Sequence, residues 1–219
     1  MIIFDCDGVL VDSEILSCET DAQLMSEAGY PITTEELIHE FIGRPKPAIW
    51  AELEKRRGTP WPDGLLDRAS DVLQMRLETE LLPVEGIAEA LGRLDGPRAV
   101  ASSSGVMKLA LSLDVCGLSG FFGDHVYSAE LVARGKPAPD VFLLAACKVG
   151  TDPADCLVIE DSAAGITAAR RAGMRAIGFT GGRHSWPAHR SVLEEAGAID
   201  ILTHMRDLPD TIEKNLRAT

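Results

Sequence analysis

Two carboxylates stand two positions apart at the end of a short apolar run near the start of the chain. Asp5 and Asp7 follow Ile2-Ile3-Phe4, and Gly8 comes directly after them. An apolar run that meets a glycine is typical of a buried strand ending in an abrupt turn. Side chains at positions i and i+2 of an extended chain share one face, and the turn can aim both at one ligand. Asp5 and Asp7 are therefore a candidate functional pair, and a solvated Asp-x-Asp-Gly turn is the alternative.

A turn rich in hydroxyl groups follows a second apolar run. Ser102, Ser103 and Ser104 come after Ala99-Val100-Ala101 and precede a predicted helix. Serine hydroxyls and the free amides at a helix N-terminus can donate hydrogen bonds to an anion. Ser102 and Ser103 are the candidate anion-binding residues, although serines in this position are also common as helix caps.

A lysine stands at a point where the chain is stiffened by two prolines. Lys136 lies in Gly135-Lys136-Pro137-Ala138-Pro139, at the predicted start of a helix. A cation is unfavourable near the N-terminus of a helix, so Lys136 is expected to have an anionic partner. A solvated surface lysine is the alternative.

Two adjacent carboxylates end a third apolar run. Glu160 and Asp161 follow Leu157-Val158-Ile159, and small residues that open a helix come next. Carboxylate oxygens are the ligands that Mg²⁺ prefers, so this pair is a candidate metal site. A helix cap at Asp161 and a solvated strand end at Glu160 are the alternatives.

These signals belong to a chain in which predicted strands alternate with predicted helices. The strands are expected at residues 2–6, 98–101, 125–128, 156–159, 175–179 and 200–202, and the helices between them at residues 86–94, 107–116, 139–149, 162–172 and 185–196. Such alternation predicts an α/β fold, a Rossmann-like parallel sheet with helices on both faces. All four signals would then meet at the carboxyl edge of the sheet.

Residues 13–83 interrupt the alternation. Four helical patterns follow one another there, at residues 13–28, 34–42, 47–57 and 62–81, without a strand between them. We therefore expect a core domain made of residues 1–12 plus 84–219 and an inserted helical cap domain of residues 13–83. An insertion that leaves from the carboxyl edge of the sheet would lie over the ligand site as a lid.

Composition narrows the partners and the compartment. A net charge of −13 disfavours nucleic acid, and no apolar run approaches the roughly 18 residues of a membrane span. The five cysteines are scattered and form no C-x-x-C pair, so neither disulfides nor a zinc site are expected. These features predict a cytoplasmic protein that binds no membrane.

Taken together, the motifs resemble the haloacid dehalogenase-like hydrolase superfamily, in its helical-cap branch of β-phosphoglucomutase and sugar-phosphate phosphatases. The resemblance implies that Asp5 is the nucleophile and becomes an aspartyl-phosphate, while Asp7 is the general acid and then the base. It further implies that Ser102 holds a phosphoryl oxygen and that Lys136 balances charge. The implied Mg²⁺ ligands are Asp5, the backbone carbonyl of Asp7, Asp161, and Glu160 directly or through water.

Within this family a phosphatase is the preferred interpretation, and three alternatives remain. A phosphomutase is disfavoured because Ser17 stands where β-phosphoglucomutase has a histidine, and the only histidine of the cap is His39. Family dehalogenases lack the second aspartate and use no magnesium, so Asp7 and the Glu160-Asp161 pair argue against that reaction. A binding or scaffold protein on the same fold is disfavoured because no motif residue is lost.

The substrate is expected to be a small phosphorylated metabolite. The cap loop Gly43-Arg44-Pro45-Lys46 carries two cations, of which Arg44 resembles a cap arginine of the sugar-phosphate branch and could bind a distal group of the substrate. The resemblance favours 6-phosphogluconate or another sugar or polyol phosphate. A monomer or weak homodimer is expected.

Overall fold

The computed structural model describes residues 1–41, 44 and 46–217. These residues form a six-stranded sheet in the order β3-β2-β1-β4-β5-β6, and every neighbouring pair is parallel. The strands are β1 (Ile2–Phe4), β2 (Arg98–Ser102), β3 (Val126–Ser128), β4 (Leu157–Glu160), β5 (Arg175–Phe179) and β6 (Asp200–Leu202). The predicted α/β fold with a Rossmann-like parallel sheet is confirmed.

The strands alternate between two hydrophobic clusters, one on each face of the sheet. In β1, Ile2 and Phe4 belong to one cluster and Ile3 to the other, as a side-chain period of two requires. The first cluster includes residues of α5 (Ile87–Gly92), α6 (Val106–Val115) and α10 (Leu208–Arg217), and the second includes residues of α7 (Asp140–Val149), α8 (Ala163–Arg171) and α9 (His189–Ala196). Helices therefore cover both faces, which explains why the strands read as continuous apolar runs.

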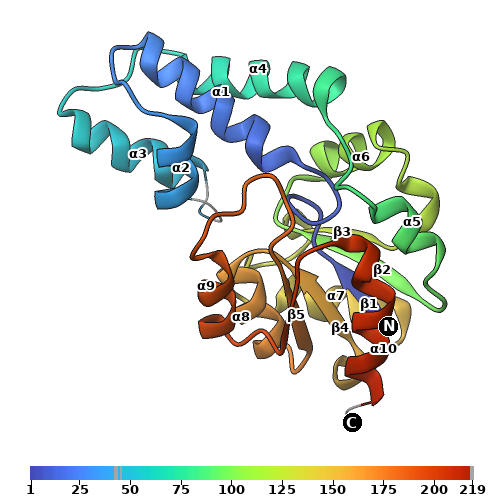
Figure 1. The fold of residues 1–219 in the computed structure, drawn as a ribbon. Helices are drawn as coiled ribbons and strands as arrows, with labels where there is room; N and C mark the ends of the chain where they lie inside the picture. The colour runs from blue at the N-terminus through green and yellow to red at the C-terminus, as the bar shows by residue number, and fades with distance from the viewer. Residues whose placement is uncertain (42–43, 45, 218–219) are drawn as a thin grey trace.

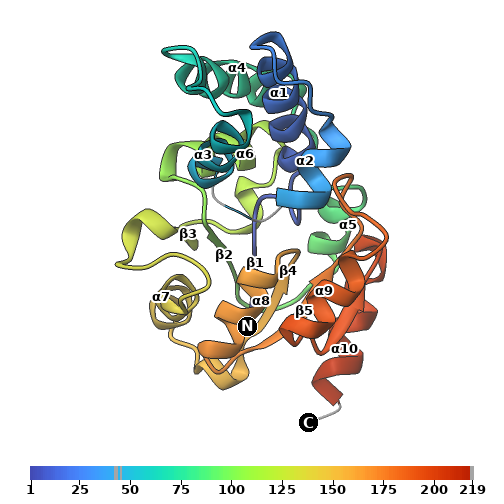
Figure 2. The ribbon, with the colours of Figure 1, turned by 90° about the vertical axis from the view of Figure 1, so that its left-hand side faces the viewer.

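A separate group of helices lies beyond the carboxyl ends of the strands (Figure 1). It consists of α1 (Ser13–Glu27), α2 (Thr34–Phe41), α3 (Lys46–Arg57) and α4 (Leu65–Glu80), which we call the helical unit. The unit has its own hydrophobic cluster, in which Met25, Phe41, Trp50 and Leu53 are almost fully buried. Figure 2 shows the same unit above the sheet from a second direction.

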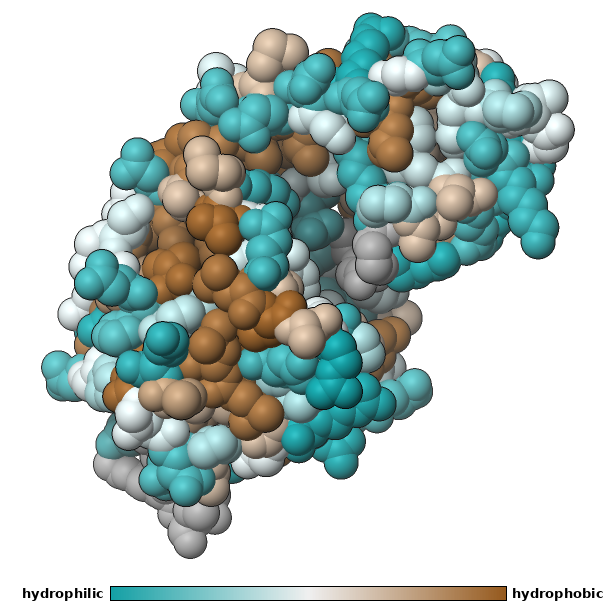
Figure 3. Space-filling model, turned by 180° about the vertical axis from the view of Figure 1, so that it is seen from behind, coloured by the Kyte–Doolittle hydropathy of each residue, from teal (hydrophilic) through white to brown (hydrophobic). Residues whose placement is uncertain are grey.

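The helical unit is joined to the sheet by two short connections that run side by side. The amide of Asp12 donates to the carbonyl of Leu82 at 3.0 Å, and the amide of Val84 donates to the carbonyl of Leu10 at 3.0 Å. Seen from behind, the molecular surface is hollowed where the unit meets the rest of the chain (Figure 3). None of the helices in the described ranges is long and apolar enough to cross a bilayer.

Some element boundaries differ from the prediction. β1 ends at Phe4 and not at residue 6, because the chain turns at once and the carbonyl of Cys6 accepts the amides of Val9, Leu10 and Val11. α4 begins at Leu65 and not at residue 62, after Gly64 in a left-handed conformation with φ of 74°. α9 begins at His189 and not at residue 185.

α10 is not among the predicted helices. Its Leu208 and Ile212 are four positions apart and pack against the sheet cluster. The predicted end of the second cap helix, Ile42, lies outside the described residues.

Candidate active site

The four signals meet at the carboxyl edge of the sheet. β1 pairs with both β2 and β4, so Asp5, Ser102 and Glu160 stand at the ends of three adjacent strands. A cavity of about 580 Å³ opens there between the sheet and the helical unit. Its lining includes Asp5, Asp7, Ser102, Ser103, Lys136 and Asp161 from the sheet side and Glu14, Ser17, Asp21, Arg44 and Lys46 from the helical unit.

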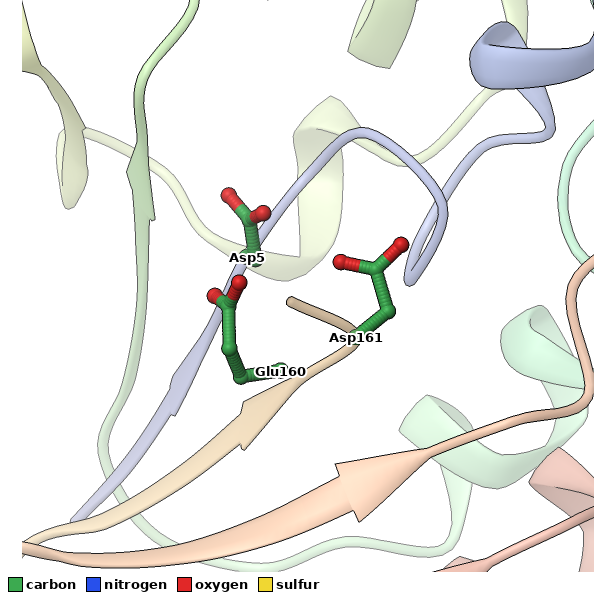
Figure 4. A group of neighbouring side chains, drawn as sticks. All are labelled: Asp5, Glu160 and Asp161. Atoms are coloured by element: carbon green, nitrogen blue, oxygen red, sulfur yellow. The ribbon is translucent and has the colours of Figure 1, made fainter. Parts of the chain in front are cut away.

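Three buried carboxylates lie together at this edge of the sheet, and two of them, Asp5 and Asp161, line the cavity. One oxygen from each of Asp5, Glu160 and Asp161 lies within 4.8 Å of the other two, and Figure 4 shows the three groups facing one another. Burial, followed by the charge of Glu160, raises the pKa of Asp5 well above its usual range. Such a cluster of hard oxygen atoms fits a divalent cation such as Mg²⁺, which would offset the repulsion among the carboxylates.

Lys136 is the cation already present at this cluster. Its Nζ lies 3.0 Å from Asp5 Oδ1 and 2.9 Å from Glu160 Oε2, and its side chain is 3% exposed. Burial alone would lower the pKa of Lys136, but the two carboxylates outweigh it and the pKa is raised. The prediction that Lys136 has an anionic partner is thus confirmed. The reason given for it, a position at the N-terminus of a helix, is wrong. α7 begins at Asp140, so Lys136 lies in the preceding turn and not at the helix start.

Glu160 is held on both of its oxygens. Oε2 pairs with Lys136, while Oε1 accepts the amide of Ser162 at 3.2 Å and its hydroxyl at 2.5 Å. Gly165 leaves room for this arrangement, since a Cβ there would lie 1.9 Å from the Glu160 carboxyl carbon. The carboxylate therefore fixes the turn between β4 and α8 as well as Lys136.

Asp7 lies in a separate network of donors. Lys108 Nζ is 2.7 Å from Asp7 Oδ1, Ser104 Oγ donates to Oδ2 at 2.5 Å, and the Ser13 hydroxyl also donates to Oδ1. Burial opposes ionisation of Asp7, but Lys108 and the hydroxyls outweigh it and lower the pKa to about 2. Asp7 is therefore ionised at neutral pH.

Lys108 and Ser104 were missed as site residues. Lys108 stands in the first turn of α6, where the helix dipole makes a cation unfavourable. The same argument led to Lys136 in the sequence. The same reasoning applied to α6 would have found Lys108.

The serine turn is only partly available to an anion. Ser102 is fully buried, and its Oγ accepts the amide of Ser104 at 3.0 Å, while Ser103 is exposed at the cavity. The sequence predicts free amides at the N-terminus of α6. The amide of Val106 instead donates to Glu130 at 3.0 Å and is not available to an anion. The hydroxyls of the turn remain the candidate donors.

Asp161 is contacted by two histidines that were also missed. Its Oδ2 lies 2.8 Å from His184 Nε2, and its backbone oxygen lies 2.6 Å from His189 Nε2. Both histidines are buried and come from the segment that follows β5. The Gly181-Gly182 pair was an available signal, since two glycines after a buried strand favour a close approach of the backbone.

The helical unit brings charged groups to the opposite wall of the cavity. Arg44 is paired with Glu52 at 2.6 Å and its side chain is 42% exposed, while Lys46 is paired with Asp21 at 2.6 Å. Glu14 lies at the start of α1, and burial followed by the charge of Asp7 raises its pKa to about 7. Gly43 and Pro45 of the cap loop lie outside the described residues.

The sheet, its insertion and the buried acidic cluster define an α/β enzyme with a helical insertion over the site. The family model described as haloacid dehalogenase-like hydrolase matches residues 2–179. The chain therefore belongs to the haloacid dehalogenase-like hydrolase family, as its motifs predict. It is a hydrolase, and the predicted class, a phosphatase, is confirmed by its named relatives.

Two solved structures are similar over nearly the whole chain. A haloacid dehalogenase-like protein of unknown function from Agrobacterium tumefaciens is 44% identical with a TM-score of 0.93, and the match covers 98% of each chain. A family hydrolase from Deinococcus radiodurans with bound phosphate and sodium is 32% identical with a TM-score of 0.85, covering 97% of this chain and 94% of that one.

Among curated relatives, 6-phosphogluconate phosphatase of Escherichia coli is 26% identical over 211 residues, which are 95% of this chain and 92% of that protein. The chloroplast protein SUPPRESSOR OF QUENCHING 1 of Arabidopsis thaliana is 34% identical over 188 residues, but the chain spans only 17% of its length.

Proposed function

We propose that the protein hydrolyses a sugar or polyol phosphate with Asp5 as the nucleophile, Asp7 as the acid and base, and Mg²⁺ as the cofactor. The observation that carries the proposal is the placement of Asp5. Asp5 lines the cavity, and its carboxylate lies beside Lys136, Glu160 and Asp161. A phosphate dianion can approach a carboxylate only where cations neutralise both groups.

The first step would transfer the phosphoryl group to Asp5. A carboxylate oxygen of Asp5 attacks phosphorus, the bond to the ester oxygen breaks, and the departing alkoxide takes a proton from Asp7. Lys136, 3.0 Å from Asp5 Oδ1, remains close to the negative charge as it moves from the carboxylate onto the phosphoryl oxygens. Ser102 stands at the end of the neighbouring strand, where its hydroxyl can donate to one of these oxygens.

The second step would release phosphate. Water attacks phosphorus and loses a proton to the Asp7 carboxylate, while the Asp5 carboxylate departs. The first requirement of a base is that Asp7 be ionised at neutral pH, and its lowered pKa meets this requirement. For the first step Asp7 must carry a proton, and a phosphoryl group that takes over Lys108 and Ser104 removes two contacts that keep it ionised.

Mg²⁺ would be held by Asp5, Asp161, the carbonyl of Asp7, and Glu160 directly or through water. When bound, the ion supplies positive charge that polarises the phosphoryl group. The three carboxylate side chains are arranged within reach of one cation.

Residues 13–83 are proposed to act as the cap that selects the substrate. The cavity volume of about 580 Å³ is suitable for a small metabolite. Its cap wall offers both acceptors and donors for hydroxyl groups: Glu14, Ser17, Asp21, Arg44 and Lys46. This lining and the relation to 6-phosphogluconate phosphatase support a sugar or polyol phosphate, with 6-phosphogluconate as the first compound to test.

The test is a phosphate-release assay over a panel of phosphorylated metabolites with Mg²⁺, using wild-type protein and the Asp5→Asn variant. We expect wild-type hydrolysis to be fastest on one sugar or polyol phosphate and the variant to release no phosphate. An isomeric sugar phosphate in place of free phosphate would identify a mutase. Substantial activity of folded Asp5→Asn protein would exclude Asp5 as the nucleophile.

A further inference from the structure

The segment after β5 is built around one side chain of the acidic cluster. His184 is 1% exposed, and its Nε2 lies 2.8 Å from Asp161 Oδ2. His189 contacts the backbone oxygen of the same residue at 2.6 Å. Asp161 is therefore fixed at both its main chain and its carboxylate by histidines from one segment.

The position of the His184 ring is itself closely determined. A Cβ at Gly182 would lie 2.6 Å from His184 Cε1, and a Cβ at Gly8 would lie 2.7 Å from the same atom. The two glycines thus leave a space that the imidazole fills. Gly8 belongs to the turn that also carries Asp5 and Asp7, so the ring joins that turn to Asp161.

The segment is anchored to the first turn by a further contact. The amide of Arg183 donates to Asp12 Oδ1 at 3.1 Å, directly before α1. On its other side, the ring of His189 stacks on Trp186 with a centroid distance of 4.1 Å and an interplanar angle of 10°. These contacts hold the two histidines in place from both ends of the segment.

Only part of the Asp161 carboxylate faces the cluster. Figure 4 shows one of its oxygens directed toward Asp5 and the other directed away. A carboxylate can rotate about its last bond, so a contact at one oxygen sets the direction of the other. For a cation that demands near-ideal ligand geometry, such as Mg²⁺, this direction affects the affinity.

We propose that His184 is a positioning residue of the metal site, which holds the Asp161 carboxylate in the orientation that binds the cation. The inference rests on the proposed metal site and adds to it a residue outside the ligand set. Residues that contact a metal ligand, but not the metal itself, typically contribute about 10- to 100-fold to the metal affinity.

The experiment is isothermal titration calorimetry of Mg²⁺ into metal-stripped protein, with wild type, His184→Leu, His184→Gln and Gly182→Ala. We expect His184→Leu to weaken Mg²⁺ binding about 10- to 100-fold. His184→Gln should recover part of the affinity, because its amide group is a polar donor that can contact the Asp161 carboxylate. Gly182→Ala retains the histidine but displaces the ring, and it should also weaken binding.

His125→Leu is the matched control, because His125 precedes β3 at the opposite end of the sheet and should leave Mg²⁺ affinity unchanged. Circular dichroism of the metal-free variants identifies any that fail to fold; if His184→Leu is one of them, Gly182→Ala decides. Wild-type affinity in a folded His184→Leu or Gly182→Ala variant would overturn the role of His184 but leave the proposed metal site unaffected. Absence of Mg²⁺ binding by the wild type would overturn the proposed metal site itself, and the inference with it.

Discussion

The ammonium group of Lys108 lies 2.7 Å from Asp7 Oδ1, and it reaches that carboxylate from the first turn of α6. Asp7 therefore has its own cation, distinct from Lys136, which serves Asp5 and Glu160. The surroundings shift the pKa values of these two aspartates of one turn in opposite directions. Burial and neighbouring carboxylates raise the pKa of Asp5, while Lys108 and two hydroxyls lower the pKa of Asp7 against the effect of burial. Groups with pKa values driven apart are typical of distinct chemical roles.

Removal of Lys108 should impair the base function of Asp7. In Lys108→Met the carboxylate keeps its hydroxyl donors but loses the ammonium group that holds its Oδ1 atom in place at 2.7 Å, so its aim at the reacting groups should be less exact. We expect turnover at pH 7 to fall about 10- to 100-fold, within the range for a general base made less effective. Steady-state kinetics on the preferred substrate measure the effect. Lys148→Met, at an exposed position of α7, is the control, and equal rates for the two variants would contradict the role of Lys108.

Glu14 should make the unliganded protein less stable as the pH rises. Its pKa of about 7 in the folded state lies above the usual 4.5, so between these values the unfolded chain ionises while the folded protein stays protonated. Stability is lost through this window and the full penalty is present above pH 7. Glu14→Gln should therefore stabilise metal-free protein at pH 8 by about 1–2 kcal/mol, allowing for the partial exposure of the side chain.

Urea unfolding of metal-free wild-type and Glu14→Gln protein at pH 8 and pH 4.5 measures this difference. The advantage of the variant should be mostly lost at pH 4.5, where Glu14 is protonated in the folded protein and only half-ionised in the unfolded chain. The exposed Glu89→Gln is the control. A stability gain of the same size at both pH values would show that its cause is not ionisation.

Arg44 should matter only for substrates that have a group far from the phosphate. Arg44→Ala should lower kcat/KM for a sugar phosphate such as 6-phosphogluconate by about ten- to a hundredfold, which corresponds to about 1.5–3 kcal/mol. An aryl phosphate without a distal group should be affected much less. To bind a substrate, Arg44 must give up its ion pair with Glu52 and contact the distal group of the substrate instead.

Arg56→Ala is a closely matched control for this substitution. Arg56 also pairs with Glu52 at 2.6 Å and lies over the ring of Phe41, as Arg44 does, but it is not among the residues that line the cavity. Comparable losses on both classes of substrate, or comparable losses in the two variants, would argue against a distal contact.

The sheet was predictable because its physical signal is local. Each strand is a short apolar run closed by a turn, and burial on both faces makes such runs continuous, as in Leu157-Val158-Ile159. The carboxyl ends of parallel strands share one edge, so Asp5, Ser102 and Glu160 could be placed together without knowledge of contacts. Helix ends were harder: Lys136 precedes α7 by four positions, and prolines in the sequence do not show which of them begins the helix.

The residues that surround and orient the site residues could not be predicted in the same way. The contacts of His184 with Asp161 and of Arg183 with Asp12 join residues far apart in the chain, and no local pattern encodes them. The pairing of Arg44 with Glu52 depends on how α3 packs beside α2, which propensity does not determine. Lys108 is the exception, because its unfavourable position in the first turn of α6 is visible in the sequence.

The most direct measurement is the identification of the residue that carries the phosphoryl group during turnover. In Asp7→Asn the second step should be slow, since the base is lost, and the phosphorylated enzyme should accumulate with an aryl phosphate, whose leaving group departs in the first step without a proton from Asp7. Reduction with borohydride would convert an aspartyl-phosphate into homoserine, which peptide mass spectrometry locates. We predict homoserine at position 5, and none in the Asp5→Asn, Asp7→Asn double variant. A phosphoryl group on another residue, or Asp5→Asn protein that still turns over, would contradict the account.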